Sequence, residues 1–497
     1  MLAFSILMLI LLAIIGCVWW YATIPRNLPP GPIGLPLFGS MFSTWRASNL
    51  HRKLYSWTKI YGPLYKLFVA DKLVVILGSW DTIQEALVKQ GDLYASRPNL
   101  DILAPDDFVP GSGLVNSEGE LWKIQLRFAL STLRDFGFGR PILEPRIKDE
   151  AEYLIEAIQS ENGQPFDPTT LLNNAVSNVI CAMVFGKRFE YEDTKFHELL
   201  GVIRNRLTEI DISFLTPFVL SPKVAKALAK VPQVRQFMDQ GASIAGFASR
   251  EITEAMQGFD PLKDEPTNYV QAFYKAQRDH KDSWTFTDDQ LLTSVSNLFV
   301  GGTDTSATTL RWAIFFLAHY PEWQEKVCNE IQSQIEGSII NYADRSKLPI
   351  TEAVLMESQR MANLVHLGVP RRTTANTKLC GYDIPEDTVI LPLLTAVLRD
   401  PEIYPNPDLF DPARFLKVQT DRERSPQFTH LIPFLTGKRV CLGEPLARME
   451  LFLFFTALFL NFKFEFPSDE PKPPIDGEKV SFIRAPVNYK ICAIRRQ

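Results

Sequence analysis

The feature that most constrains this chain is a ten-residue segment near its C-terminus, Phe434 to Gly443, with the sequence FLTGKRVCLG. Cys441 stands there between Gly437 and Gly443, two residues after Arg439, and a strongly apolar run follows. A buried thiolate carries a charge that needs compensation, and glycines let the backbone turn tightly enough to aim N–H groups at sulfur. The segment therefore predicts a ligand-binding thiolate in front of a buried helix. The alternative is an ordinary buried thiol.

A second segment with unusual composition lies inside a long helical pattern that covers residues 288–320. It reads GGTDTS and begins at Gly301. Two glycines within a helix cost about 1 kcal/mol each relative to alanine, so they need a reason. The Thr305 hydroxyl can bond the carbonyl of Gly301, four residues back, and loosen the helix. The alternative is a contact of small residues between packed helices.

These two segments, with E-x-x-R at 357–360 and P-x-R-F at 412–415, resemble the signature motifs of the cytochrome P450 family. The resemblance spans nearly the whole chain and is strongest to the second microsomal family of animals. It implies a mainly α fold with small β-sheets (α+β), the P450-like fold with an N-terminal transmembrane helix. It also implies heme b, with the Cys441 thiolate as the axial ligand of the iron.

The resemblance further implies roles for individual residues. Asp304 and Thr305 are the expected catalytic pair, guiding protons during oxygen activation. A structural ion-pair trio comprises Glu357, Arg360 and Arg414. The expected cofactor-binding residues are Cys441, Arg439, Arg97, Trp122, Arg371, Phe434 and Gly443. The expected substrate pocket, mainly apolar and so suited to a hydrophobic substrate, includes Phe108, Phe299, Gly301, Val365, His366 and Phe482.

The N-terminus predicts a membrane anchor. Residues 1–25 contain no charged side chain and are long enough to span a bilayer as a helix. Only cations precede Asp71, the first acidic residue, so the positive-inside rule places the remainder in the cytosol. We expect a signal-anchor at 1–25 in the endoplasmic reticulum membrane, a proline-rich hinge at 26–39 and a haem-binding catalytic domain at 40–497. A cleaved signal peptide is the alternative, but a basic n-region is missing.

Two hydrophobic segments suggest further packing. In the hinge, the apolar residues Ile33, Leu35, Leu37 and Phe38 predict that this segment packs on the catalytic domain. The segment 214–220 is unusually apolar for a loop, and we expect it to dip into the membrane.

Composition and missing motifs limit the partners. The net charge of -5 gives no global attraction to nucleic acid, and six scattered cysteines without a C-x-x-C pair indicate neither a zinc site nor a disulfide framework. No G-x-G-x-x-G follows a predicted strand, so the electrons come from outside. The expected donors are NADPH–cytochrome P450 reductase and, as a second candidate, cytochrome b5. Cations that could form a docking face are Lys123, Arg127, Arg134 and Lys438.

The expected function is therefore that of a membrane-anchored haem-thiolate monooxygenase in xenobiotic or lipid metabolism. It would hydroxylate or epoxidise a hydrophobic organic substrate with O2 and electrons from NADPH. One alternative is a haem-thiolate isomerase that needs no reductase, and another is a non-catalytic haem or lipid-binding sensor. The intact Asp304–Thr305 pair disfavours both.

Overall fold

The computed structural model describes residues 24–35, 38–44, 49–69, 72–98, 111–209, 231–280, 284–335, 340–416 and 425–496, and the single positions 5, 8, 15 and 16. Within this part of the chain no helix has the length and apolar character that a membrane span requires. The expected anchor at 1–25 lies almost entirely outside the described residues. So do Phe108 and the apolar segment 214–220.

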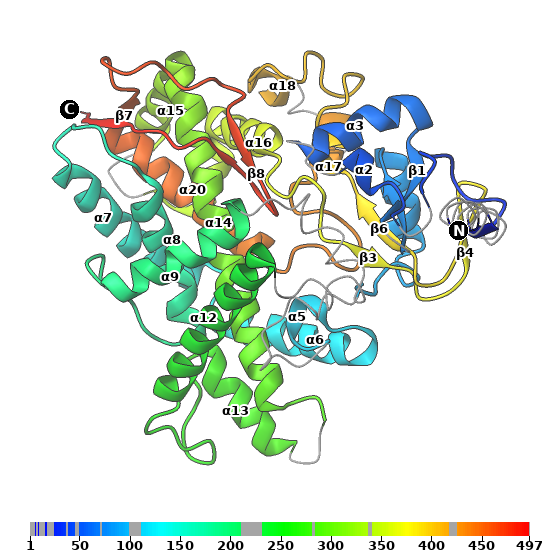
Figure 1. Ribbon diagram of the computed structural model, residues 1–497. Helices are drawn as coiled ribbons and strands as arrows, with labels where there is room; N and C mark the ends of the chain where they lie inside the picture. Colours follow the sequence, from blue (N-terminus) through cyan, green and yellow to red (C-terminus); the bar gives the residue numbers. More distant parts are fainter. Residues whose placement is uncertain are drawn as a thin grey trace.

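Helices form most of the described fold, as the resemblance implies (Figure 1). The long helices are α3 (Leu50–Tyr61), α6 (Gly119–Asp135), α7 (Glu144–Ser160), α8 (Thr169–Val184), α9 (Thr194–Arg204), α12 (Pro232–Ala255), α13 (Tyr269–Asp279), α14 (Asp288–His319), α15 (Pro321–Gln334), α16 (Pro349–Ala362) and α20 (Glu444–Asn461). Shorter helical segments are α2 (Met41–Thr44), α4 (Trp80–Ile83), η1 (Gln84–Lys89), α5 (Gly113–Asn116), η3 (Pro141–Leu143), η4 (Asn205–Glu209), η5 (Tyr342–Lys347), α17 (Leu394–Leu398), α18 (Ala413–Leu416) and α19 (Pro426–Thr429).

The strands form small sheets, which confirms the expected α+β class. The largest has the order β1-β2-β6-β3 and is built from β1 (Leu64–Val69), β2 (Lys72–Leu77), β6 (Val389–Pro392) and β3 (Arg371–Arg372). In Figure 1 it lies at the right beside α3, while most long helices gather at the left. Three two-stranded sheets pair β4 (Thr377–Leu379) with β5 (Tyr382–Ile384), β7 (Phe462–Glu465) with β10 (Cys492–Arg495), and β8 (Glu478–Val480) with β9 (Arg484–Pro486).

The α14 helix is the centre of the helical part, in contact with α5, α8, α12, α16 and α20. Its start is capped by Thr287, whose side chain accepts the N–H of Gln290 at 3.2 Å, and Pro321 begins the next helix. These ends agree with the predicted range to one residue. The helix is continuous through Gly301, so the loosening expected from the Thr305 hydroxyl is not seen.

The hinge packs on the domain, but not by the residues expected. Lys66 of β1 donates its backbone N–H to the carbonyl of Pro30 at 2.8 Å, and Leu28 is buried. Ile33 is 84% exposed, and Leu35 and Phe38 are also exposed. Proline has no backbone N–H to donate, so this segment bonds the domain through its carbonyls, such as that of Pro30. Of the four side chains expected to pack, Leu37 lies outside the described residues and the other three are exposed, whereas the apolar side chain that is buried is Leu28.

Candidate functional site

The Cys441 loop has the tight backbone that its sequence predicts. Gly437 has φ of +78°, and a Cβ there would lie 2.0 Å from the carbonyl oxygen of Leu87, so only glycine fits. Leu435 also has a positive φ, of +64°, in this loop. The N–H of Cys441 donates to the carbonyl of Phe434 at 3.1 Å, which closes the turn. Gly443 differs from expectation, because its φ of -77° is open to any residue.

The sulfur of Cys441 lies at the start of α20. Burial raises the pKa of the thiol, while the backbone N–H groups of Gly443 and Glu444 act in the opposite direction. Cys441 nevertheless keeps accessible surface, although protein surrounds it on most sides. An accessible face in such surroundings borders an internal space. The sulfur is thus placed to ligate a metal there, with helix N–H groups to stabilise its charge.

Three arginines from distant parts of the chain meet beside this loop. Arg97, Arg371 of β3 and Arg439 are all buried, and each donates to backbone carbonyls. Arg439 also lies over the ring of Trp122 on α6, with 3.9 Å between the guanidinium carbon and the ring centroid. The structure therefore brings together Arg97, Trp122, Arg371 and Arg439, four of the residues expected to bind the cofactor.

The charge of this arginine cluster is not compensated by the described residues around it. Burial and the neighbouring guanidinium of Arg97 lower the pKa of both Arg371 and Arg439 to about 9. Within the described chain, Nε and Nη1 of Arg371 and Nη1 of Arg439 have no hydrogen-bond partner. The nearby carboxylate of Glu118 is engaged by Arg372 at 2.7 and 2.8 Å. Buried cations with unmet donors indicate a site for a ligand with anionic groups.

Farther from Cys441, a buried ion-pair trio joins two helices. Arg360 of α16 bonds Glu357 through Nε at 2.7 Å and Nη2 at 2.9 Å. Arg414 of α18 bonds the same carboxylate at 3.1 Å and donates to the carbonyl of Pro405. The guanidinium groups of Arg360 and Arg414 also donate to backbone carbonyls. Their donors are thus used within the fold, as a structural role requires.

The turn of α14 at Gly301 is not covered by neighbouring residues of the described chain. Gly301 and Thr305 keep accessible surface, whereas the helix is buried from Ser306 to Ala318. A Cβ on Gly301 would meet no atom within 4 Å, and the Thr305 hydroxyl donates to the Gly301 carbonyl at 2.8 Å. The helix is continuous here, so this uncovered turn does not involve a bulge.

Asp304 points elsewhere. Its carboxyl is fully buried, and Oδ1 accepts from the amide of Asn173 on α8 at 3.3 Å, while Oδ2 lacks a partner among the described residues. Burial raises its pKa, and the nearby Arg311 acts against this.

The same turn of α14 has a contact with α20 on its other side. The Ser306 hydroxyl lies 2.8 Å from a carboxylate oxygen of Glu450 on α20. The sequence motifs did not indicate a role for Glu450, because no pattern of nearby residues distinguishes this acidic residue within its apolar helix.

The expected pocket residues divide into two groups. Val365 and Phe482 keep accessible surface, as does Gly301. Phe299 does not, because its ring is fully buried against Phe247, with ring centroids 5.1 Å apart. His366 is also fully buried and packs edge-on against His51, with centroids 4.8 Å apart. Phe299 and His366 therefore pack in the core of the described structure, and their place in the substrate pocket stays a prediction.

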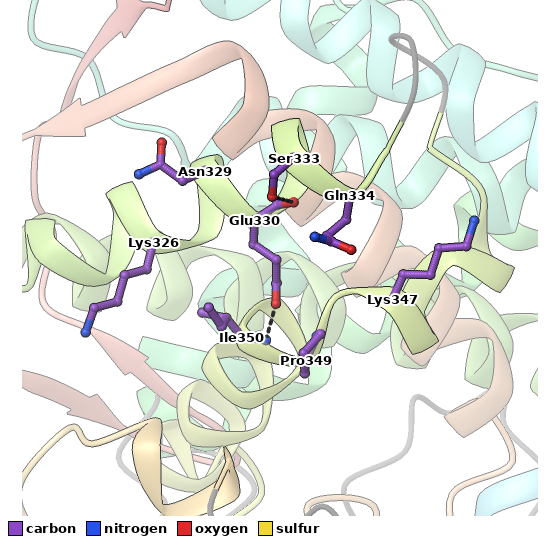
Figure 2. A pocket seen from close by; sticks show the side chains of 8 residues that line it. All are labelled: Lys326, Asn329, Glu330, Ser333, Gln334, Lys347, Pro349 and Ile350. Carbon is purple, nitrogen blue, oxygen red and sulfur yellow. Dashed lines mark hydrogen bonds between the residues drawn. The ribbon is translucent and has the colours of Figure 1, made fainter.

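A hollow on the surface between α15 and α16 is separate from this site (Figure 2). Glu330 at its floor accepts the backbone N–H groups of Ile350 and Thr351 at 2.7 and 2.8 Å. This carboxylate therefore caps the start of α16. Its role there is structural.

The residues around Cys441 fit the haem that the motifs imply. A thiolate at a helix start suits iron, the unmet donors of Arg371 and Arg439 suit two carboxylates, and the accessible faces of Cys441 and Gly301 leave room for a planar group. No cluster of three or more His, Cys, Asp or Glu side chains that could hold another metal occurs in the described ranges.

Comparison with known proteins agrees with this geometry. The family model for Cytochrome P450 matches residues 29–493. Rabbit (Oryctolagus cuniculus) cytochrome P450 2J1 is 40% identical over 476 residues, which cover 95% of this chain and 92% of the relative. Human (Homo sapiens) cytochrome P450 2J2 is 38% identical over 475 residues, with the same coverage. Chicken (Gallus gallus) cytochrome P450 2H2 is 36% identical over 503 residues, which cover 99% of both chains.

Proposed function

This chain belongs to the cytochrome P450 family, and we propose that it is a membrane-anchored member that hydroxylates or epoxidises a hydrophobic substrate with electrons from NADPH. It is a monooxygenase with a haem cofactor ligated by cysteine thiolate. One observation carries the proposal. The buried arginines beside Cys441 have donors without partners among the described residues, and these donors would bind the carboxylates of haem.

Each residue has a definite task in this reaction. Haem held by Cys441 supplies the activation of dioxygen by iron. Arg97, Arg371 and Arg439 neutralise its carboxylates and orient it. The Thr305 hydroxyl, in the uncovered turn at Gly301, would hold a proton for oxygen activation. Asp304 supplies protons to Thr305 after a side-chain rotation away from Asn173, for which its neutral form is favoured by burial.

The electron donor is proposed to be NADPH–cytochrome P450 reductase, with cytochrome b5 as a second donor. Lys123, Arg127 and Arg134 are exposed along one face of α6, and Lys438 lies in the Cys441 loop. Asp92 pairs with Lys438 and also interacts electrostatically with Lys123, so the exposed face of α6 and the Cys441 loop are neighbours. A basic surface there favours an acidic electron-transfer partner.

The membrane location is proposed from the N-terminal sequence. The uncharged segment 1–25 would anchor the chain in the endoplasmic reticulum, with the catalytic domain in the cytosol. The partly exposed apolar residues Val365 and Phe482 support a hydrophobic substrate.

The test is a product screen with purified protein, the reductase, NADPH and isotopically labelled dioxygen. Pools of fatty acids, sterols and lipophilic xenobiotics are offered, and products are identified by mass. A product with one labelled oxygen atom that depends on the reductase is expected. Product formation without reductase or dioxygen would instead favour the isomerase, and haem binding without turnover of any pool would favour a sensor.

A further inference from the structure

A buried carboxyl that the reaction scheme does not use lies between α20 and α14. Glu450 is 1% exposed, and its Oε2 lies 2.8 Å from the hydroxyl of Ser306. Its Oε1 has no partner within the part of the chain that the structure describes. An ionised carboxylate with a single hydrogen bond in apolar surroundings is strongly disfavoured.

The electrostatic surroundings of Glu450 keep it neutral. The elements packed against α20 include α7, α14, α15 and α16. Burial raises the pKa of Glu450 to about 8, opposed by the Ser306 hydroxyl, and no described cation on these elements lowers it. On its own helix, Arg448 pairs with Glu444 in a partly exposed position. Burial and the single hydrogen bond therefore favour the protonated form of this carboxyl.

The Ser306 contact fixes the turn that faces the haem site. Ser306 directly follows Thr305, and Asp304 on its other side is held by Asn173 of α8. The turn is thus attached to α8 on one side and to α20 on the other. Because α20 begins three residues after Cys441, one helix both follows the thiolate loop and reaches the Thr305 turn.

We propose that neutral Glu450 is a positioning residue for oxygen activation, which fixes Thr305 relative to the Cys441 loop through its hydrogen bond with Ser306. The inference rests on the proposed roles of Thr305 and Asp304. Ionisation of Glu450 would place a charge in this apolar contact and loosen the turn. Proton delivery through Thr305 would then be less efficient. More of the reduced oxygen would leave as hydrogen peroxide, and less would be incorporated into product.

The experiment compares the wild type with Glu450→Gln, Glu450→Leu and Ser306→Ala in the reconstituted system. The share of NADPH electrons lost as peroxide is measured from neutral pH to well above pH 8. In the wild type this share should rise several-fold as pH increases through about 8, following the tenfold change in the proton ratio per pH unit. Gln, which keeps a neutral hydrogen-bonding group, should give a low and pH-independent loss. Leu and S306A should give a high loss at every pH.

Two readouts on the resting protein do not depend on turnover. Infrared difference spectra across this pH range should show a protonated carboxyl that is absent from Glu450→Gln. Amide hydrogen exchange of residues 300–309 should be faster in Glu450→Leu and Ser306→Ala than in the wild type and Glu450→Gln. Ser306→Ala keeps the test decisive if Glu450→Leu fails to fold.

The proposal is overturned if Glu450→Gln shows the same alkaline rise in peroxide as the wild type, or if no protonated carboxyl is assigned to Glu450. Unchanged exchange in Ser306→Ala would overturn it as well. Failure of the proposed function looks different. In that case no variant, including the wild type, forms an oxygenated product, while the infrared and exchange results still report on Glu450.

Discussion

At the scale of single residues, the proposed haem site combines charges that the described part of the chain does not balance. Arg371 is fully buried beside Arg97, with two unmet donor nitrogens in the described structure. Burying a cation without a partner destabilises a fold, and the same cation stabilises a bound anion. Arg371 is therefore expected to lower the stability of the haem-free protein while it raises the affinity for haem.

We expect Arg371→Met to lower haem affinity and to raise the unfolding free energy of the haem-free protein by about 1–4 kcal/mol. Chemical denaturation of the haem-free form and haem titration measure the two effects. The matched control is Arg372→Met, because Arg372 pairs with Glu118 and is partly exposed. This control should lower stability by less than about 1 kcal/mol. Destabilisation of the haem-free protein by Arg371→Met would contradict the argument.

Gly437 gives a second prediction at this scale. Gly437→Ala should prevent haem incorporation, because its Cβ would lie 2.0 Å from the Leu87 carbonyl oxygen and its φ is +78°. Gly381→Ala is the control, since φ there is +85° but nothing lies within 4 Å. The control should cost about 1 kcal/mol from backbone strain alone. Haem content by absorbance and thermal unfolding check both, and equal effects of the two substitutions would refute the steric reason.

At the scale of elements, sequence patterns predicted those features that are determined by residues close together in the sequence. The ends of α14 at Thr287 and Pro321 follow from local signals. The orientation of Phe299 did not, because which face of a buried helix meets α12 depends on tertiary packing. Glu450 was missed for the same reason, as its partner Ser306 is distant in sequence.

The E-x-x-R trio shows how such distant contacts join elements. Glu357→Gln should destabilise the protein by about 3–5 kcal/mol, because Arg360 and Arg414 would be left buried without a counter-charge. Denaturant unfolding of the haem-bound protein measures this. Glu265→Gln, at an exposed pair with Lys275, should have no measurable effect. A similar small effect at both sites would show that the trio is not a structural connection.

At the scale of the whole molecule, two buried groups set opposite limits on stability with pH. The pKa of Glu450 is raised to about 8, so its contribution is present at low pH and is lost as pH rises from about 4.5 through 8. Burial and Arg484 lower the pKa of His366 to about 3, so its contribution is present above about 6.5 and is lost as pH falls toward 3.

Stability should therefore be greatest in weakly acidic solution. His366 lies among His51, Arg484 and Glu478, so the acid limit reflects this group together. Glu450→Gln should flatten the alkaline decline, and His366→Gln should flatten the acid decline. Thermal unfolding midpoints across the pH range measure both. Unchanged slopes in the two variants would rule out these groups as the cause.

The pairing of β2 with β6 has a consequence for how the protein is made. Val74 pairs with Val389, so β2 near the start of the domain can complete its pairing only after β6, near the end of the domain, has been synthesised. Until the ribosome has released that later segment, the edge of β2 has no partner and is open to association with other chains. Biogenesis should therefore be limited by this late closure, and the nascent chain should depend on chaperones until nearly all of it has emerged.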